Sequence, residues 1–306
     1  MLKSSSFRCM TTDIELFLDA SDGGLGREVL RRAEDLFRDV EARFSRFLDD
    51  SELSQLNRIQ AESVQVSPDL AELVALAIAA ARNSDGIFDP TVIDALEAAG
   101  YDRSIDLIRK NGTHAPRPVA PHPDRWKEVV VDTARSTVRL PAGVRLDLGG
   151  IGKGWAVDRA GAMLQPYGAG MVSAGGDIRA WGDQPGLQSG QGWLVALDHP
   201  EEPGKDLAWL RVRNGAVATS SITARRWAGG HHLINPRTAR PADTDLLSVT
   251  VLGPTAVQAE VAAKVALILG REAGLAWLAE QPGVEAVLVD ESNAMFGTSG
   301  IEGVLA

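Results

Sequence analysis

The stretch LDLGGIGKGWAVDRA occupies residues 146–160 and combines acids, a lysine and a cluster of glycines. VRLDL predicts a strand that ends at the glycines, and the segment from Lys153 onward predicts a helix. Glycines at such a turn let backbone N–H groups approach an anion, and Lys153 adds a mobile positive charge. The stretch indicates a phosphate or pyrophosphate site, although it fits neither the Walker pattern nor the dinucleotide fingerprint. A purely structural turn is the alternative, and Asp158 is interpreted as a structural charge.

The composition is ordinary for a soluble globular enzyme, with 306 residues, 44% hydrophobic and 24% charged. A net charge of −10 disfavours nucleic acid or an anionic membrane surface as the main partner. The single cysteine, Cys9, excludes an intramolecular disulfide. Because no apolar run has the length of a signal peptide or a membrane span, we expect a cytoplasmic protein without a membrane anchor.

Helical and strand patterns are mixed along the chain, so we expect an α+β fold. Helices are predicted at 26–47, 67–86, 153–165, 255–270 and 271–281. Strands are predicted at 13–20, 126–132, 137–150, 170–176, 177–182, 192–199, 207–220, 246–253 and, as a closing pair, 285–301. A hairpin is expected around Pro141-Ala142-Gly143, and 111–126 is expected to be a proline-rich loop. No low-complexity linker divides the chain, which predicts a single domain over residues 1–306.

Further motifs extend the pattern over nearly the whole chain. They are SRFLDDSELSQLN (45–57), GIFDPTV (86–92), SAGGDIRAWG (173–182), VATSS (217–221), HHLINPRTARP (231–241) and SVTVLGPTAVQAEVAAKVALILG (248–270). Each motif alone is weak. Together with residues 146–160, in this order and spacing, they resemble the FAD:protein FMN transferase family, the ApbE-type flavin transferases, from about Phe7 to about Leu278.

The resemblance implies two intimately packed α/β lobes with mixed and antiparallel sheets and an FAD cleft between them. It also implies a transferase that cleaves FAD, releases AMP and attaches FMN through a phosphoester bond to a threonine of a target flavoprotein. Two alternatives stay open: a non-catalytic FAD-binding protein, and an FAD pyrophosphatase that gives FMN and AMP. The target flavoprotein and the oligomeric state are not specified by the sequence.

The resemblance assigns FAD contacts to Met10, Phe47, Phe88, Asp89, Asp147, Lys153, Thr219 and Ser220. Lys153 would reach the pyrophosphate, Asp147 a ribose hydroxyl or the adenine amine, and Phe47 would stack on the adenine. Alternatively, Asp147 only caps its turn and Lys153 is solvated. Thr11 and Ser221 replace family glycines, and Ser221 would narrow that part of the pocket.

His232 is the predicted general base, because a histidine with a pKa near 6.5 can take a proton from an alcohol at neutral pH. The family normally has an aspartate where this chain has Asn235, the second predicted catalytic position. An amide cannot accept the proton, so this departure leaves transfer in question.

The resemblance predicts two metal ligands, the Gly150 carbonyl and Glu260. Glu260 stands where the family has an aspartate that binds Mg²⁺. Lys264 stands at the family's threonine ligand. Magnesium prefers hard oxygen ligands, and a protonated lysine has no lone pair to give. Either Lys264 places its ammonium where the metal would sit, or the metal binds differently, or the two residues form an i,i+4 salt bridge. A requirement for Mg²⁺ is therefore in doubt.

Overall fold

The computed structural model describes residues 1–188, 190–202 and 204–306. The chain forms two compact units, each assembled from segments that are distant in sequence. The unit that we call the sheet unit contains Met1–Asp39, Lys153–Ala224 and Thr244–Ala306. The unit that we call the helical unit contains Val40–Gly152 and Arg225–Asp243. The expectation of a single domain stays a prediction.

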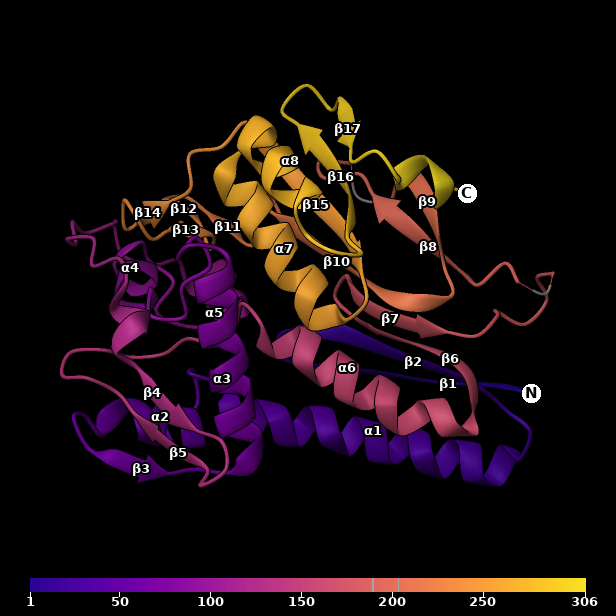
Figure 1. The fold of residues 1–306 in the computed structure, drawn as a ribbon, viewed down its shortest axis with the longest axis horizontal. Helices are drawn as coiled ribbons and strands as arrows, with labels where there is room; N and C mark the ends of the chain where they lie inside the picture. The colour runs from indigo at the N-terminus through magenta and orange to yellow at the C-terminus, as the bar shows by residue number, and fades with distance from the viewer. Residues whose placement is uncertain (189, 203) are drawn as a thin grey trace. The chain divides into compact units, whose positions relative to one another are not determined.

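The sheet unit is built on an eight-stranded sheet with the order β1-β2-β6-β7-β10-β15-β16-β17 (Figure 1). Its strands are β1 (Leu2–Cys9), β2 (Thr12–Ala20), β6 (Gly168–Ala174), β7 (Asp177–Trp181), β10 (Asn214–Ser221), β15 (Leu246–Gly253), β16 (Glu285–Asp290) and β17 (Met295–Gly297). A separate hairpin pairs β8 (Trp193–Asp198) with β9 (Asp206–Val212). Every pairing among the described strands is antiparallel. The α+β prediction is confirmed, and the expectation of a mixed sheet is not met in these residues.

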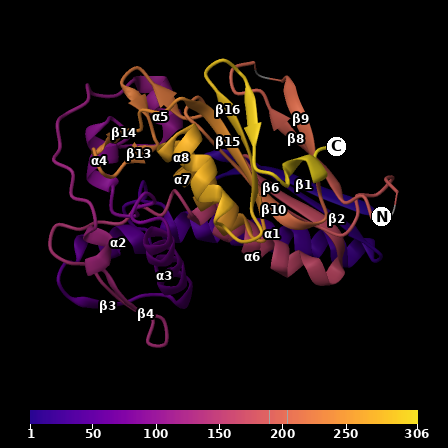
Figure 2. The same cartoon turned by 45° about the horizontal axis from the view of Figure 1, so that its top comes forward.

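Two helices of the sheet unit meet where a glycine permits close approach. They are α6 (Gly152–Leu164) and α7 (Ala256–Leu269), and α7 packs on β10 and β15 (Figures 1 and 2). A Cβ on Gly154 would lie 2.7 Å from the Ala256 carbonyl oxygen. Asp158 accepts hydrogen bonds from the N–H groups of Ala256 at 2.9 Å and Val257 at 3.0 Å. Asp158 therefore caps the start of α7, in agreement with its interpretation from the sequence as a structural residue.

The remaining helices of the sheet unit are α8 (Arg271–Ala279) and most of α1 (Gly23–Phe44). Short 3₁₀ turns cover Gln165–Tyr167 and Ile301–Gly303. The amphipathic α1 buries Val29, Ala33, Phe37 and Val40 and leaves most of its charged residues exposed. Among the helices of the described ranges, none combines the length and the apolar character needed to cross a membrane.

The longest helix that lies wholly in the helical unit is α3 (Pro68–Asn83), whose buried face carries leucine, valine, isoleucine and alanine. Its other helices are α2 (Glu52–Arg58), α4 (Ile93–Ala98) and α5 (Ile105–Asn111), with a 3₁₀ turn at Arg125–Glu128. A small sheet has the order β3 (Ser63–Gln65), β5 (Thr137–Arg139) and β4 (Val130–Asp132). Two short pairs complete the unit: β11 (Arg226–Trp227) with β12 (Gly230–His231), and β13 (Ile234–Asn235) with β14 (Arg240–Pro241).

The strand predicted over 137–150 is wrong beyond Arg139, and so is the hairpin at 141–143. The turn lies at 133–136, between β4 and β5. Residues 144–148 belong to no strand, because the backbone of Leu146 forms hydrogen bonds with a side chain instead of with a neighbouring strand. Asn57 Nδ2 donates to Leu146 O at 2.9 Å, and Leu146 N donates to Asn57 Oδ1 at 2.8 Å. Asp147 N also donates to Pro90 O at 2.8 Å. These long-range bonds hold the segment extended up to the glycine turn.

Candidate functional site

Four charged residues of the sheet unit form a buried group that we call the charge cluster. Lys153 comes from the start of α6, Asp177 from the start of β7, and Glu260 and Lys264 from α7. Lys153 forms an ion pair with Asp177, and its Nζ lies 3.6 Å from Glu260 Oε1. Lys264 Nζ lies 3.0 Å from the same oxygen, and the Gly154 N–H donates to Glu260 Oε2 at 2.9 Å. Both oxygens of Glu260 therefore have partners.

The acids and the lysines of the cluster differ in exposure. The side chains of Asp177 and Glu260 are 1% and 2% exposed, whereas those of Lys153 and Lys264 keep 14% and 13%. Burial raises the pKa of Asp177 to about 6 against the opposing charge of Lys153. Burial would also raise the pKa of Glu260, but the charges of Lys264 and Lys153 outweigh it and lower that pKa to about 2. Glu260 is therefore an ionised acid that faces two ammonium groups.

This arrangement does not fit a divalent cation at Glu260. Glu260 Oε1 accepts a hydrogen bond from the Lys264 ammonium, and Oε2 accepts one from a backbone N–H. Within the described ranges, no group of three or more His, Cys, Asp or Glu side chains is arranged to hold a metal ion. Gly150, the other predicted ligand, lies in the turn that precedes α6. The i,i+4 pair of Glu260 and Lys264 is thus present, but it is buried rather than solvated.

Asp147 forms a buried ion pair in the helical unit. Its Oδ2 lies 2.9 Å from Arg46 Nε, and its Oδ1 accepts the Gly149 N–H at 2.6 Å. Only 11% of the Asp147 side chain and 5% of the Arg46 side chain are exposed. Asp147 therefore caps the glycine turn, as its alternative interpretation says, and both of its oxygens have partners within the chain.

Arg46 also contacts a group of ring side chains that we call the aromatic cluster: Phe47, Tyr101, Trp227 and His232. The Arg46 guanidinium lies 4.2 Å from the centre of the Phe47 ring and 5.1 Å from that of Tyr101. Tyr101 stacks on Trp227 with 5.4 Å between ring centroids and meets His232 edge-on at 6.4 Å. The predicted adenine contact, Phe47, thus has Arg46 over its ring and Tyr101 at 5.7 Å.

The two adjacent histidines have different surroundings. His231 is buried, accepts the Leu233 N–H on Nδ1 at 3.3 Å, and its Nε2 lies 3.1 Å from Ala242 O. Because Nδ1 accepts, Nε2 carries the proton of a neutral ring. His232 is half-buried and lies beside Tyr101. Of the pair, His231 has a structural role, and His232 stays the candidate base.

Asn235 closes the turn between β13 and β14. Its side-chain Oδ1 accepts the Arg237 N–H at 3.0 Å, and its carbonyl accepts the N–H groups of Thr238 at 3.1 Å and Ala239 at 2.9 Å. Asparagine and aspartate both form such turns, so the local fold does not require an amide here.

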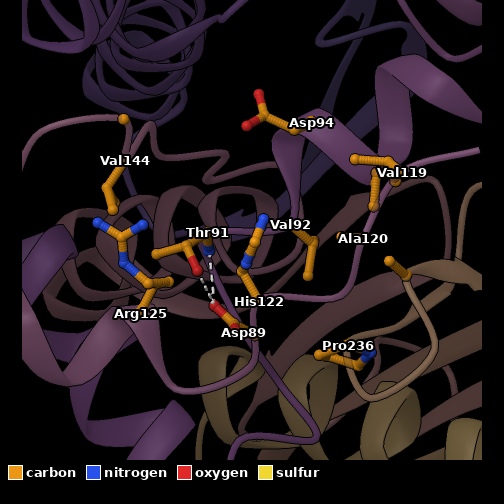
Figure 3. Close-up of a pocket in the computed structure, with 13 residues that line it drawn as sticks. Asp89, Thr91, Val92, Asp94, Val119, Ala120, His122, Arg125, Val144 and Pro236 are labelled. Carbon is orange, nitrogen blue, oxygen red and sulfur yellow. Dashed lines mark hydrogen bonds between the residues drawn. The ribbon is translucent and has the colours of Figure 1, made fainter.

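A pocket in the helical unit contains Asp89 (Figure 3). The Asp89 carboxylate accepts hydrogen bonds from the N–H of Thr91 at 2.7 Å and from its hydroxyl at 2.6 Å. Burial raises the pKa of Asp89 although these bonds oppose it. The rest of the polar lining comes from Asp94, His122 and Arg125, and the neighbouring Phe88 is buried. These hydrogen bonds to Thr91 fix the turn at residues 89–91, which forms part of the pocket wall.

The other predicted FAD contacts lie in the sheet unit. Met10 and Thr11 are the central residues of the β1–β2 turn, with φ of 54° and 59°. These angles match a type I′ turn, in which both central residues have positive φ. The glycine that the family has at position 11 adopts such angles easily, whereas Thr11 is strained there. Thr219 and Ser220 are successive residues of β10 and point to opposite faces of the sheet. Thr219 is exposed and its hydroxyl lies 2.9 Å from that of Thr250, whereas Ser220 is buried.

The structure divides the predicted residues between the two units. The sheet unit carries Met10, Lys153, Thr219, Ser220, Glu260 and Lys264, and the helical unit carries Phe47, Phe88, Asp89, Asp147, Gly150, His232 and Asn235. Sequence reasoning missed Tyr101 and Trp227, which lie outside every motif and are joined only by the fold. It also missed His122 and Arg125, which lie within 111–126, a segment that was predicted only as a loop.

Known proteins of one family resemble this chain in sequence. The sequence matches the ApbE family over residues 10–288. A protein named FAD:protein FMN transferase from Treponema pallidum is 31% identical over 83% of this chain and 74% of its own length. A protein of that name from Haemophilus influenzae is 27% identical, covering 94% of this chain and 86% of its own. The one from Rhodobacter capsulatus is 34% identical over 81% of this chain, which spans 48% of that protein.

Solved structures share the fold over the full chain. The ApbE protein of Thermotoga maritima superimposes with a TM-score of 0.88 at 24% identity, covering 99% of both chains. The flavin transferase ApbE of Vibrio cholerae gives a TM-score of 0.79 at 23% identity, also over 99% of both chains. At these identities the likeness establishes the architecture, and the chemistry has to be argued from this chain's own residues.

Proposed function

The chain belongs to the ApbE family and is a flavin transferase, and from this premise we propose that it cleaves FAD, releases AMP and attaches FMN to a threonine of a target flavoprotein. The observation that carries the proposal is the charge cluster. Two buried acids hold two lysines on the accessible side, so an anion that approaches the cluster meets positive charge first. A pyrophosphate is the anion that the FAD substrate supplies.

The reaction is a phosphoryl transfer and needs charge neutralisation, an aligned nucleophile and a proton acceptor. The threonine hydroxyl oxygen attacks the phosphorus of the FMN half and forms the new phosphoester bond. The bond between that phosphorus and the bridging oxygen breaks, and AMP leaves with the electron pair. Lys153 holds the pyrophosphate oxygens during this exchange.

Residues of the helical unit are proposed to contact the rest of FAD and to handle the proton. Phe47 and the pocket at Asp89 offer an aromatic ring and a polar wall for the adenosine half. Asp147 acts by fixing the glycine turn and the Arg46 side chain. Met10, from the sheet unit, remains a proposed contact of the adenosine half. Thr219 and Ser220 remain proposed flavin contacts, and the exposed Thr219 is the more accessible of the two.

His232 is proposed to take the threonine proton. It is half-buried beside Tyr101, whereas His231 uses its ring to hold the backbone. Asn235 cannot take a proton, so the chain relies on His232 for this step. Asn235 is also the observation that favours the second candidate function, an FAD-binding protein without transferase activity.

Incubation of the protein with FAD tests the proposal, with and without a flavoprotein that bears an acceptor threonine. We expect the target to gain the mass of one FMN less water and AMP to appear in equal amount. AMP and free FMN without target labelling would instead identify a pyrophosphatase. Tight FAD binding without AMP would identify a non-catalytic FAD-binding protein.

A further inference from the structure

We propose that the Lys264 ammonium takes the place of a divalent cation in this chain, so that FAD binds to the charge cluster without a metal ion. The inference rests on the proposed function for the identity of the anion. It concerns a departure of this sequence from the family pattern. The chemical class of ligand is a pyrophosphate, held by two lysines instead of by a lysine and a metal.

The layering of the cluster supports an anion site. Asp177 and Glu260 form the inner layer and are 1% and 2% exposed, while Lys153 and Lys264 form the outer layer at 14% and 13%. The inner carboxylates fix the ammonium groups in place, and the outer ammonium groups keep access to solvent. Such preorganised charge needs little rearrangement when an anion arrives.

The bonding of Glu260 disfavours a metal. Lys264 Nζ lies 3.0 Å and Lys153 Nζ 3.6 Å from Oε1, and the Gly154 N–H donates to Oε2 at 2.9 Å. A magnesium ion would need an oxygen of Glu260 at about 2.0–2.1 Å. At that distance the ion would compete with the two ammonium groups at Oε1 and with the N–H that joins α6 to α7 at Oε2.

Charge balance points the same way. The cluster contains two lysines and two acids, so its ionised form is neutral without any added ion. A divalent cation at Glu260 would add a double positive charge within a few ångströms of two ammonium groups. This repulsion is substantial even at an intermediate effective dielectric.

The first experiment measures metal binding without flavin. Mn²⁺ is the probe, and its binding to the FAD-free protein is followed by electron paramagnetic resonance. We expect the native protein to leave millimolar Mn²⁺ free. The variant that combines Glu260→Asp with Lys264→Thr restores the usual oxygen ligands and is expected to bind the ion. Native protein that binds Mn²⁺ as tightly as this variant would overturn the inference, whether or not FAD binds.

The second experiment measures FAD affinity by flavin fluorescence, in EDTA and in millimolar Mg²⁺. The native affinity is expected to be the same in both. Lys264→Met is expected to weaken binding in EDTA by about ten- to a hundred-fold, because a charged hydrogen bond to the pyrophosphate is lost. Lys264→Arg keeps the charge and should retain metal-free binding. A native protein that binds FAD only with Mg²⁺ contradicts the inference but not the proposed function. Failure to bind FAD under any condition contradicts the proposed function.

Matched variants separate anion binding from a structural salt bridge. Combining Glu260→Gln with Lys264→Met removes both charges, so that no buried carboxylate loses its partner. If Lys264 only pairs with Glu260, this variant keeps native FAD affinity, and the inference is wrong. If Lys264 holds the pyrophosphate, affinity falls as in Lys264→Met. Lys205→Met deletes a lysine from the exposed pair with Glu202 and should change nothing.

Discussion

The backbone N–H of Gly154 donates to Glu260 Oε2 at 2.9 Å and joins the start of α6 to α7. This bond exists because the two helices touch at a glycine, where a Cβ would lie 2.7 Å from the Ala256 carbonyl oxygen. The geometry of the charge cluster therefore depends on the packing of two helices as well as on its four side chains.

Gly154→Ala is expected to lower the free energy of unfolding by roughly 1–3 kcal/mol, because the new methyl group collides with a backbone oxygen that cannot move alone. The measurement is urea unfolding. Gly152→Ala is the control on the same helix, since a Cβ there meets nothing within 4 Å. Equal stability of Gly154→Ala and the native protein would show that α6 and α7 can separate at no cost.

Lys153→Ala is expected to weaken FAD binding by about ten- to a hundred-fold, through the loss of a charged hydrogen bond. In the double variant Lys153→Ala/Asp177→Asn, no buried carboxylate is left without its lysine. This variant should lose FAD affinity to the same extent as Lys153→Ala. Lys205→Ala removes an exposed lysine and serves as the control. An unchanged dissociation constant in both Lys153 variants would place this lysine outside the FAD site.

His232→Ala is expected to bind FAD with nearly native affinity and to slow transfer by about 10²–10⁴-fold, the usual contribution of a general base. Single-turnover labelling of a threonine-bearing target measures the rate. Native transfer by the variant would assign the base role to another group.

Asn235→Asp is expected to raise the transfer rate, on the order of ten-fold or more, because it adds a proton acceptor at a position where acid–base groups contribute strongly. The fold should persist, since a carboxylate oxygen can accept the Arg237 N–H in place of the amide oxygen. Single-turnover rates compare the two proteins. A slower variant with unchanged FAD affinity would show that the amide itself serves the reaction.

His231 predicts a pH-dependent contribution to stability. Burial lowers its pKa below the usual value, the nearby charge of Arg226 acts in the same direction, and the bond to Ala242 O opposes them. The folded protein therefore binds this proton less well than the unfolded chain. The stabilisation is complete above the unfolded pKa of about 6.5 and is lost as the pH falls toward the folded pKa.

The test compares urea unfolding of the native protein and of His231→Gln between pH 8 and pH 5. The native protein should lose more stability on acidification than the variant does. His122→Gln, at an exposed position, should follow the native curve. Parallel curves for the native protein and His231→Gln would contradict the assignment of a neutral ring at His231.

Most of the helices and strands were predictable from local patterns. The helices predicted at 67–86 and 255–270 are observed as α3 and α7, which begin at serine and threonine caps, Ser67 and Thr255. The segment 137–150 shows where this reasoning failed. Alternating apolar residues predicted a strand, but Asn57 and Pro90 supply the backbone partners of residues 146 and 147.

The sequence by itself determined the α+β class, the helix that begins near Lys153 and the i,i+4 spacing of Glu260 and Lys264, because these depend on local periodicity. Only the tertiary structure decided that Asp177 and Lys153 join that pair, and that Tyr101, Trp227 and His232 meet. Such contacts connect residues far apart in the chain. Nothing in local spacing encodes them, since they arise when α6 packs on α7 and when the helical unit folds.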